Sequence, residues 1–146
     1  MSYASDADIE RVARGLMDRT LPLAEWTHAA HFAVALWLAW QDCEAACRDM
    51  PGMIRAYNAA NGGVNSDTEG YHETITQASL GAACSLLSKA APGTPLHAVL
   101  RDLMVSEFGR SDWLLAYWSK PVLFSVEARR GWVDPDLSPL PFETRT

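Results

Sequence analysis

The sequence predicts an all-α fold, a compact single-domain bundle of about five to seven helices with an irregular, proline-rich C-terminal tail. Apolar residues recur three and four positions apart in several segments, as they do along one face of a helix. No segment shows the sustained alternation of apolar and polar residues that is typical of a half-buried strand. Capping residues and Pro-Gly pairs separate the periodic segments and indicate where helices begin and end.

Length and composition indicate one domain. The chain has 146 residues, of which 49% are hydrophobic and 21% charged, proportions that are ordinary for a globular protein. A chain of this length buries roughly two thirds of the surface that its unfolded form exposes. We therefore expect a single helical domain over residues 1–146, in which residues 131–146 form an irregular tail packed on the bundle.

The first helix is expected over residues 6–18, with Ser5 as its N-cap. Residues 21–23, with a proline at their centre, break the chain, and Thr27 is placed to cap a second helix over about residues 28–41. This second helix is apolar around its whole circumference. A helix of this kind is surrounded by other elements or by a partner chain.

The middle of the chain alternates helices with breaks. Residues 42–48 either continue the second helix or form a short separate one, and Pro51-Gly52 interrupts the chain before a helix over residues 53–60. Residues 61–70 form a polar loop, rich in residues that tolerate positive φ, which is either a solvated loop or a lid over a site. A fourth long helix follows this loop and runs to about Lys89.

The last third of the chain holds shorter elements. A capping Thr-Pro pair opens a fifth helix over about residues 95–106. A sixth helical stretch, residues 113–119, is broken by Pro121, and residues 125–130 form a last short helix. From residue 131 onward, three prolines exclude regular helix, while apolar residues among them give the tail anchors on the bundle.

Charge and hydropathy exclude two classes of partner. The net charge is −6 at pH 7, and no stripe of Lys and Arg is present to displace counterions from a phosphate backbone. The longest nearly uninterrupted apolar run, residues 29–40, has 12 residues, fewer than the roughly 18 to 20 that cross a bilayer. We therefore expect neither nucleic acid nor a membrane as a partner.

Three cysteines, Cys43, Cys47 and Cys84, are an odd number, and the acidic start of the chain differs from a signal peptide. Both observations predict a cytoplasmic protein with free thiols. Cys43 and Cys47 stand four residues apart without a C-x-x-C pattern, so we expect cysteines that pack and do no redox chemistry.

His28 and His31 form the first part of a candidate site. Residues three apart on a helix lie on one face, with Cβ atoms roughly 5–6 Å apart, so both imidazoles could reach one ion or one ligand. Ala35 and Ala39 continue that face, and small residues leave space in front of the rings.

His72 forms the second part. On the helix that follows the polar loop it lies near the centre of the apolar face, with Thr76 one turn further along and Glu73 at the edge. Burial lowers the pKa of a histidine and a neighbouring carboxylate raises it. His72 can therefore be tuned as a base or held neutral as a metal ligand.

Together these residues predict a small-ligand or metal-binding site between the second and fourth helices. Three histidines can complete a zinc-type site with an open position for water, where metal-assisted hydrolysis or another acid-base step takes place. The cofactor would then be a divalent transition metal such as zinc. The hypothesis assigns the metal ligands His28, His31 and His72, the catalytic pair His72 and Glu73, and a ligand pocket walled by Trp26, Tyr71 and Thr76.

Two other interpretations stay open. Each histidine can be a structural residue hydrogen-bonded to a backbone carbonyl, and His97 is interpreted as a surface or capping residue. The zinc-protease pattern H-E-x-x-H begins at His72-Glu73 but is not completed, because residue 76 is a threonine and not the second histidine. The protein can also be a non-catalytic interaction or regulatory module that docks on a partner or on a second copy through its second helix and exposed tryptophans.

Three stretches carry a resemblance to known proteins: Glu25-Trp26-Thr27-His28-Ala29-Ala30-His31, Gly70-Tyr71-His72-Glu73-Thr74-Ile75-Thr76, and Ser125-Val126-Glu127-Ala128-Arg129 with the later Pro135 to Pro141. Together they resemble, over most of the chain, a group of small uncharacterised bacterial all-helical proteins with W-T-H-x-x-H and Y-H-E-T motifs. The resemblance implies a compact bacterial cytoplasmic helical domain, and it brings no reaction or cofactor with it.

Overall fold

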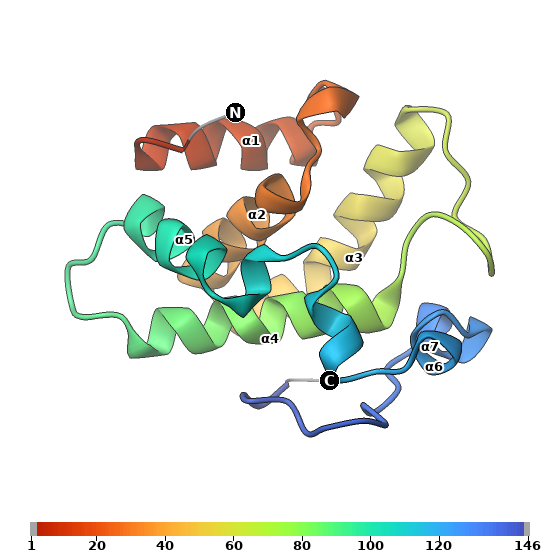
Figure 1. Ribbon diagram of the computed structural model, residues 1–146. Helices are drawn as coiled ribbons and strands as arrows, with labels where there is room; N and C mark the ends of the chain where they lie inside the picture. The colour runs from red at the N-terminus through yellow and green to blue at the C-terminus, as the bar shows by residue number, and fades with distance from the viewer. Residues whose placement is uncertain (1–2, 145–146) are drawn as a thin grey trace.

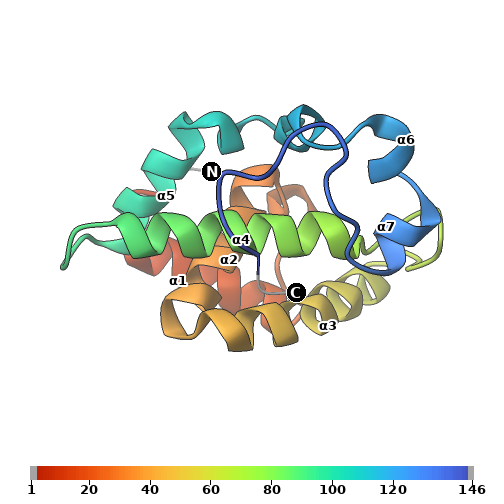
Figure 2. The ribbon, with the colours of Figure 1, turned by 90° about the horizontal axis from the view of Figure 1, so that it is seen from below.

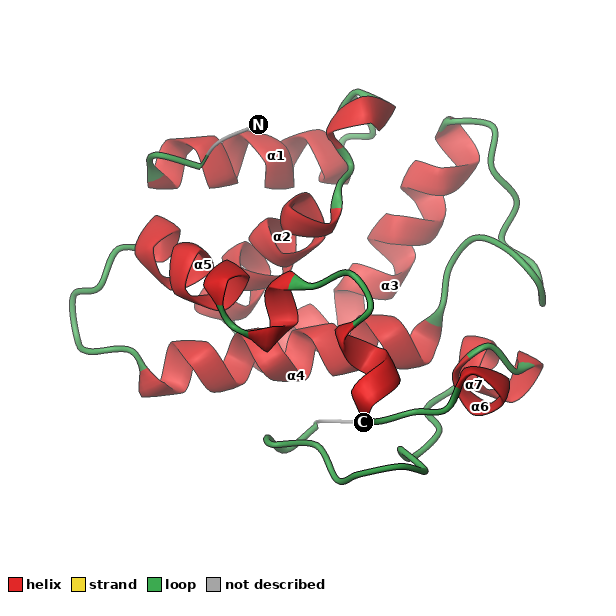
Figure 3. Cartoon of the chain, viewed as in Figure 1, coloured by secondary structure: helices red, strands yellow, loops and turns green. Residues whose placement is uncertain are grey.

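The computed structural model describes residues 3–144, and every regular element in this range is a helix (Figure 3). The predicted all-α class is therefore confirmed. Seven α-helices and three short 3₁₀ helices follow one another along the described part of the chain. Their bounds are α1 Asp6–Met17, η1 Leu23–Glu25, α2 His28–Gln41, α3 Cys43–Ala60, α4 Glu73–Lys89, α5 Leu96–Val105, η2 Glu107–Gly109, η3 Trp113–Ala116, α6 Lys120–Leu123 and α7 Val126–Arg130.

α2 lies at the centre of the bundle (Figure 1). α1, α3, α4 and α5 all pack against it, which explains why its sequence is apolar on every side. From Ala30 to Leu36, only His31 is not fully buried. Although α2 is so apolar, neither it nor any other helix of residues 3–144 has the length and hydropathy to cross a membrane.

Side-chain caps set the beginnings of the two helices that follow η1. Thr27 Oγ1 accepts a hydrogen bond from the backbone N–H of Ala30 at 3.2 Å, so α2 begins at His28. Asp42 ends α2 and caps α3 with its own carboxylate. Residues 43–48 therefore begin a new helix rather than continue the previous one.

α3 passes through Pro51 without a break, so the predicted interruption at this proline is wrong. A proline inside a helix lacks an N–H and leaves the carbonyl four residues earlier without its helical donor. Here that carbonyl belongs to Cys47, and it accepts a hydrogen bond from Gln77 Nε2 of α4 at 3.0 Å. The neighbouring helix thus supplies the hydrogen bond that the proline removes.

The segment after α5 is less regular than its sequence predicts. Residues 113–119 hold only the short 3₁₀ turn Trp113–Ala116 in place of the predicted sixth helix. Pro121 lies in the first turn of α6 and does not break it, because N–H groups in a first turn have no helical acceptor. The last predicted helix, residues 125–130, is present as α7, which begins one residue later.

The chain beyond α7 runs across α4 as an irregular tail (Figure 2). Trp118 Nε1 donates a hydrogen bond to the carbonyl of Val133 at 2.9 Å. Phe142 lies against the middle of α4, where a Cβ added to Gly81 would stand 2.6 Å from its ring. A hydrogen bond and an aromatic anchor therefore hold residues 131–144 along the bundle.

A disulfide joins Cys43, at the start of α3, to Cys84 of α4. The expectation of free thiols is therefore wrong for these two cysteines, whose sequence separation of 41 residues gave no hint of the pairing. Because disulfides persist mainly in oxidising compartments, the cysteines no longer support the predicted cytoplasmic location. Cys47 lies one turn along α3 from Cys43 and is half-buried.

Candidate functional site

An open pocket of about 420 Å³ lies between the first turns of α2, the C-terminal half of α3 and the start of α4. Small-molecule sites have volumes of roughly 300–1,000 Å³. The loop over residues 61–72, here called the covering loop, joins α3 to α4 and forms one side of the pocket (Figure 3). Five residues singled out in the sequence lie on the pocket wall: Trp26, His31, Tyr71, His72 and Thr76.

His31 lines the pocket with both of its ring nitrogens uncommitted. Its ring packs against Trp26, with centroids 5.3 Å apart, and neither nitrogen has a hydrogen-bond partner within residues 3–144. Burial, with a smaller contribution from the charge of His28, lowers the pKa of His31 to about 4. At pH 7 the imidazole is therefore neutral and offers one donor and one acceptor to a molecule in the pocket.

His72 also lines the pocket, but the fold uses both of its ring nitrogens. As the N-cap of α4, its Nδ1 accepts a hydrogen bond from the backbone N–H of Ile75 at 3.1 Å. Its Nε2 donates to the carbonyl of Leu123 at 2.7 Å, which fixes the tautomer with the proton on Nε2. Burial is the main cause that lowers the pKa of His72, so the ring is neutral at pH 7. Neither nitrogen is left for a metal ion or a substrate.

His28 takes part in packing outside the pocket. Its Nε2 lies 2.8 Å from the carbonyl oxygen of Phe108, and its ring stands edge-on to Phe32 with centroids 5.2 Å apart. Within residues 3–144, no three His, Cys, Asp or Glu side chains are placed to hold a metal ion. The structure does not gather the predicted ligands His28, His31 and His72 into one site. His28 binds the carbonyl of Phe108 and His72 binds the carbonyl of Leu123.

Glu73 binds Tyr71 and is not part of the pocket wall. The Tyr71 hydroxyl donates to Glu73 Oε1, and Gln77 Nε2 lies 3.4 Å from Oε2. Burial and then this carboxylate raise the pKa of Tyr71 well above its usual value, so the phenol stays protonated. The predicted catalytic residues His72 and Glu73 share no hydrogen bond in the described structure, and Glu73 instead anchors a residue of the pocket wall.

Besides Asn61, Tyr71 and His72, the covering loop contributes four residues to the wall: Gly63, Val64, Glu69 and Gly70. Gly70 has a φ of +84°, and a Cβ at this position would collide with the carbonyl oxygen of Val64. Arg129 Nη1 donates to the Gly70 carbonyl at 3.0 Å, and Arg130 pairs with Asp67 at 2.6 Å. The two arginines of α7 therefore hold the covering loop against the pocket.

Asn58 and Asn61 are wall residues that the sequence reasoning missed. Asn58 Nδ2 donates to Asn65 Oδ1 at 3.1 Å, and Asn61 Nδ2 donates to the carbonyl of Tyr57 at 2.9 Å. Their spacing of three residues at the end of a helix places them on one side, a signal that the sequence does contain. The arginines of α7 carry no comparable signal, because only the folded chain brings residues 129–130 to the covering loop.

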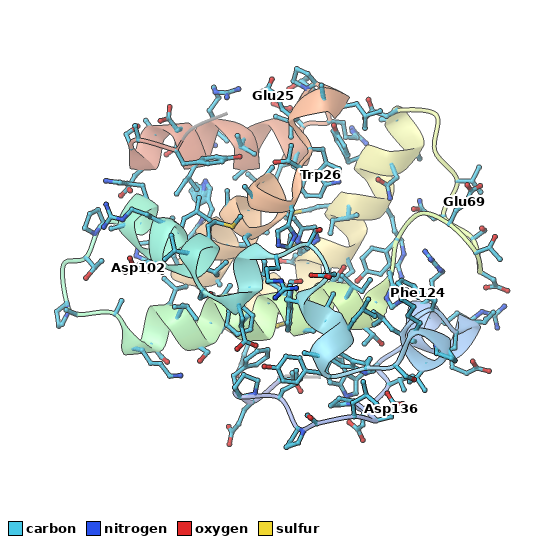
Figure 4. The ribbon with its side chains drawn as sticks, in the orientation of Figure 1. Glu25, Trp26, Glu69, Asp102, Phe124 and Asp136 are labelled. Atoms are coloured by element: carbon cyan, nitrogen blue, oxygen red, sulfur yellow. A yellow bond between two sulfur atoms is a disulfide. The ribbon has the colours of Figure 1, made fainter. Side chains whose placement is uncertain are left out.

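The pocket wall combines an aromatic face, an uncommitted imidazole and the oxygen atoms of amide and carboxylate groups. Trp26 lies between η1 and α3, and Glu69 lies on the covering loop (Figure 4). Such a wall can stack on a planar molecule and form hydrogen bonds along its edge. Comparisons of the chain with protein-family models, with curated proteins and with solved structures found no match.

Proposed function

We propose that the protein binds a small organic molecule in the pocket beside His31. The observation that carries this proposal is the pair of uncommitted ring nitrogens of His31 on the pocket wall. Polar side chains inside folded proteins have hydrogen-bond partners in the large majority of cases. The ring nitrogens of His31 face an open pocket, where a ligand can form hydrogen bonds with them.

The chemistry of the wall favours a ligand with a flat ring. Trp26 offers an indole face next to the ring of His31, and Ile54 and Ile75 add apolar surface. Aromatic pairs contribute about 0.5–1.5 kcal/mol beyond the area that they bury. A ring lying on this surface would bring polar atoms at its edge within reach of His31.

Binding is favoured over acid-base catalysis. A general base works best when its pKa lies near the working pH, and the pKa of His31 is about 4. The two predicted catalytic residues are engaged elsewhere, since His72 binds Leu123 and Glu73 binds Tyr71. Neither one therefore supplies a proton-transfer partner for His31.

An NMR titration tests the proposal. Protein labelled in its four histidines is titrated at pH 7 with tryptamine, tryptophol and indole-3-propionate, which share one ring system. We expect at least one compound to shift the ring signals of His31 with saturation. The signals of His97 should not move, because its ring is hydrogen-bonded to Asp6 outside the pocket. If none of the three compounds at millimolar concentration moves the His31 signals, the proposal is wrong.

Matched variants connect the titration to the pocket. His31→Leu replaces the imidazole with an apolar side chain of similar size and removes the hydrogen bond, so we expect binding to be lost. His31→Gln keeps a donor and an acceptor and should retain part of the affinity. His97→Leu is the control, because it removes a histidine from α5 without touching the pocket.

The exposure of Trp40 favours a second candidate function, a non-catalytic interaction module that pairs with another copy of the chain. Its side chain is 64% exposed near the end of α2, beside a depression lined by Trp37, Leu96 and acidic residues of α1. Aromatic residues are enriched at the centres of interfaces. Light scattering over a range of protein concentrations tests this function. A dimer that Trp40→Gln dissociates would support it, and a monomer at all concentrations would exclude it.

A further inference from the structure

We propose that the ligand of the pocket is an organic cation, an arylalkyl amine whose ring lies on Trp26 and whose ammonium group is held by the acceptors of the wall. This inference rests on the proposed function and adds the charge of the ligand. It follows from three properties of the wall, which are its charge, its hydrogen-bonding atoms and its aromatic face.

Glu69 is the one residue among the described wall residues that carries a full charge at pH 7. The wall contains no Lys or Arg, and its histidines His31 and His72 are neutral because burial lowers their pKa values. The carboxylate of Glu69 has no ion-pair or hydrogen-bond partner within residues 3–144. The wall therefore offers a negative charge that a cationic ligand can neutralise.

The amide and carboxylate side chains of the wall present oxygen acceptors to the pocket. Asn58 and Asn61 direct their amide nitrogens to other residues, which leaves both Oδ1 atoms without a donor from residues 3–144. The neutral ring of His31 adds a nitrogen acceptor. An ammonium group has three donors and no acceptor, so it complements this set, whereas a carboxylate brings acceptors alone.

Trp26 supplies the aromatic face that cations favour. Its indole ring is half-buried and packs on His31 and on Tyr57, with centroids 5.3 and 5.7 Å away. Among aromatic side chains, the face of tryptophan attracts cations most strongly. The two neighbouring rings fix the orientation of Trp26, so its face is presented without a further loss of side-chain entropy.

The nearby arginines do not reverse this charge balance. Arg130 is paired with Asp67 at 2.6 Å, and Arg129 donates hydrogen bonds to backbone carbonyls of the covering loop. The Arg55 guanidinium lies over the ring of Tyr71, 4.2 Å from its centre. All three line a separate, smaller depression and not the pocket beside His31.

Three compounds that differ only in their end group test the charge of the ligand. Tryptamine, tryptophol and indole-3-propionate share the ring and a two-carbon spacer, and end in an ammonium, a hydroxyl and a carboxylate. From the His31 shifts at pH 7 and low salt, we expect tryptamine to bind about ten times more tightly than tryptophol, and indole-3-propionate to bind most weakly. Added salt should reduce the advantage of tryptamine, because Glu69 is exposed.

A pair of charge-matched variants separates the local effect of Glu69 from the overall charge of −6. Glu69→Gln and Asp102→Asn each remove one negative charge. Asp102 lies on α5, on the opposite side of the molecule from Glu69 (Figure 4). We expect Glu69→Gln to weaken tryptamine binding about threefold to tenfold and to leave tryptophol binding unchanged, whereas Asp102→Asn should change neither.

The possible failures can be told apart. Equal affinities for the three compounds, or tightest binding of the carboxylate, would overturn the inference of a cationic ligand and leave the proposed function intact. Equal effects of the two charge variants would also overturn it, because the attraction would then come from the whole chain. If no compound moves the His31 signals, the proposed function itself fails.

Discussion

Gln77 Nε2 donates a hydrogen bond to the carbonyl oxygen of Cys47 at 3.0 Å. In a regular helix this carbonyl would accept from the backbone N–H of residue 51, but residue 51 is a proline and has no N–H. A buried carbonyl left without a donor costs about 1–3 kcal/mol. The bond therefore makes the proline compatible with a continuous α3. It also ties α3 to α4, the two helices on either side of the pocket.

Gln77→Leu should lower the free energy of unfolding by about 1–3 kcal/mol, measured by urea denaturation. In a Pro51→Ala background the same substitution should cost less, because alanine returns a helical N–H to the Cys47 carbonyl. Gln41→Leu is the control, since its amide lies at the exposed end of α2, and it should change stability by less than about 0.5 kcal/mol. An equal cost of Gln77→Leu in both backgrounds would contradict this account.

Stability should fall as the pH is lowered from about 6.5 to 4. The folded protein holds His31 at a pKa of about 4, whereas an unperturbed histidine has a pKa of 6.5, so the unfolded state binds more protons in this window. The contribution is fully present above pH 6.5 and is lost as the pH falls, by about 2–3 kcal/mol at pH 4. Burial lowers the pKa of His72 as well, which adds a loss of the same sign.

Urea denaturation at a series of pH values measures this dependence. His31→Leu should flatten the slope between pH 6.5 and 4, because leucine binds no proton in either state. His97→Leu serves as the comparison, since its ring lies outside the pocket. A slope that His31→Leu leaves unchanged would show that the proton uptake belongs to other groups.

Reduction of the Cys43–Cys84 disulfide should lower the free energy of unfolding by about 3–4 kcal/mol, given the 41 residues between its two ends. Denaturation with and without a reducing agent measures the loss, and the double variant Cys43→Ala, Cys84→Ala should match the reduced protein. Alkylation in denaturant should modify two more thiols per chain after reduction than before it. The same number of reactive thiols before and after would rule the disulfide out.

Gly70→Ala should disturb the covering loop. Gly70 has a positive φ, and the added Cβ meets the Val64 carbonyl oxygen, so we expect a loss of about 1–2 kcal/mol and weaker binding of tryptamine. Gly52→Ala is the matched control. It lies inside α3 with open space around it, and the substitution should stabilise the protein by about 0.5–1 kcal/mol without affecting binding. Unchanged binding by Gly70→Ala would show that the loop does not shape the pocket.

Local sequence information was enough for the fold class and failed for contacts between distant segments. Helical periodicity and caps such as Thr27 depend on residues close together in the chain. The continuity of α3 through Pro51 depends instead on Gln77, which reaches the Cys47 carbonyl from 30 residues away. The disulfide depends in the same way on how α3 packs against α4, and spacing rules carry no information about such pairs.

The candidate site could likewise be predicted in part from local sequence, and the rest depends on contacts between distant segments. Helical spacing grouped His28 with His31, yet residues three apart still differ by about 60° around the axis. In the folded chain that difference takes His28 to the carbonyl of Phe108, 80 residues later, and leaves His31 on the pocket wall. The sequence could identify both imidazoles as unusual, but the position of Phe108 decides which of them remains uncommitted.

The Cys43–Cys84 disulfide and the peptide between its ends form a closed covalent ring, which contains α3, the covering loop and most of α4. Residues 61–70 of this ring are all exposed. A protease that cleaves one bond there opens the ring but does not divide the molecule, because the two fragments stay joined through sulfur. The nicked protein would still migrate as one species of about 16.1 kDa without reductant, and α3 and α4 would remain fastened on either side of the pocket.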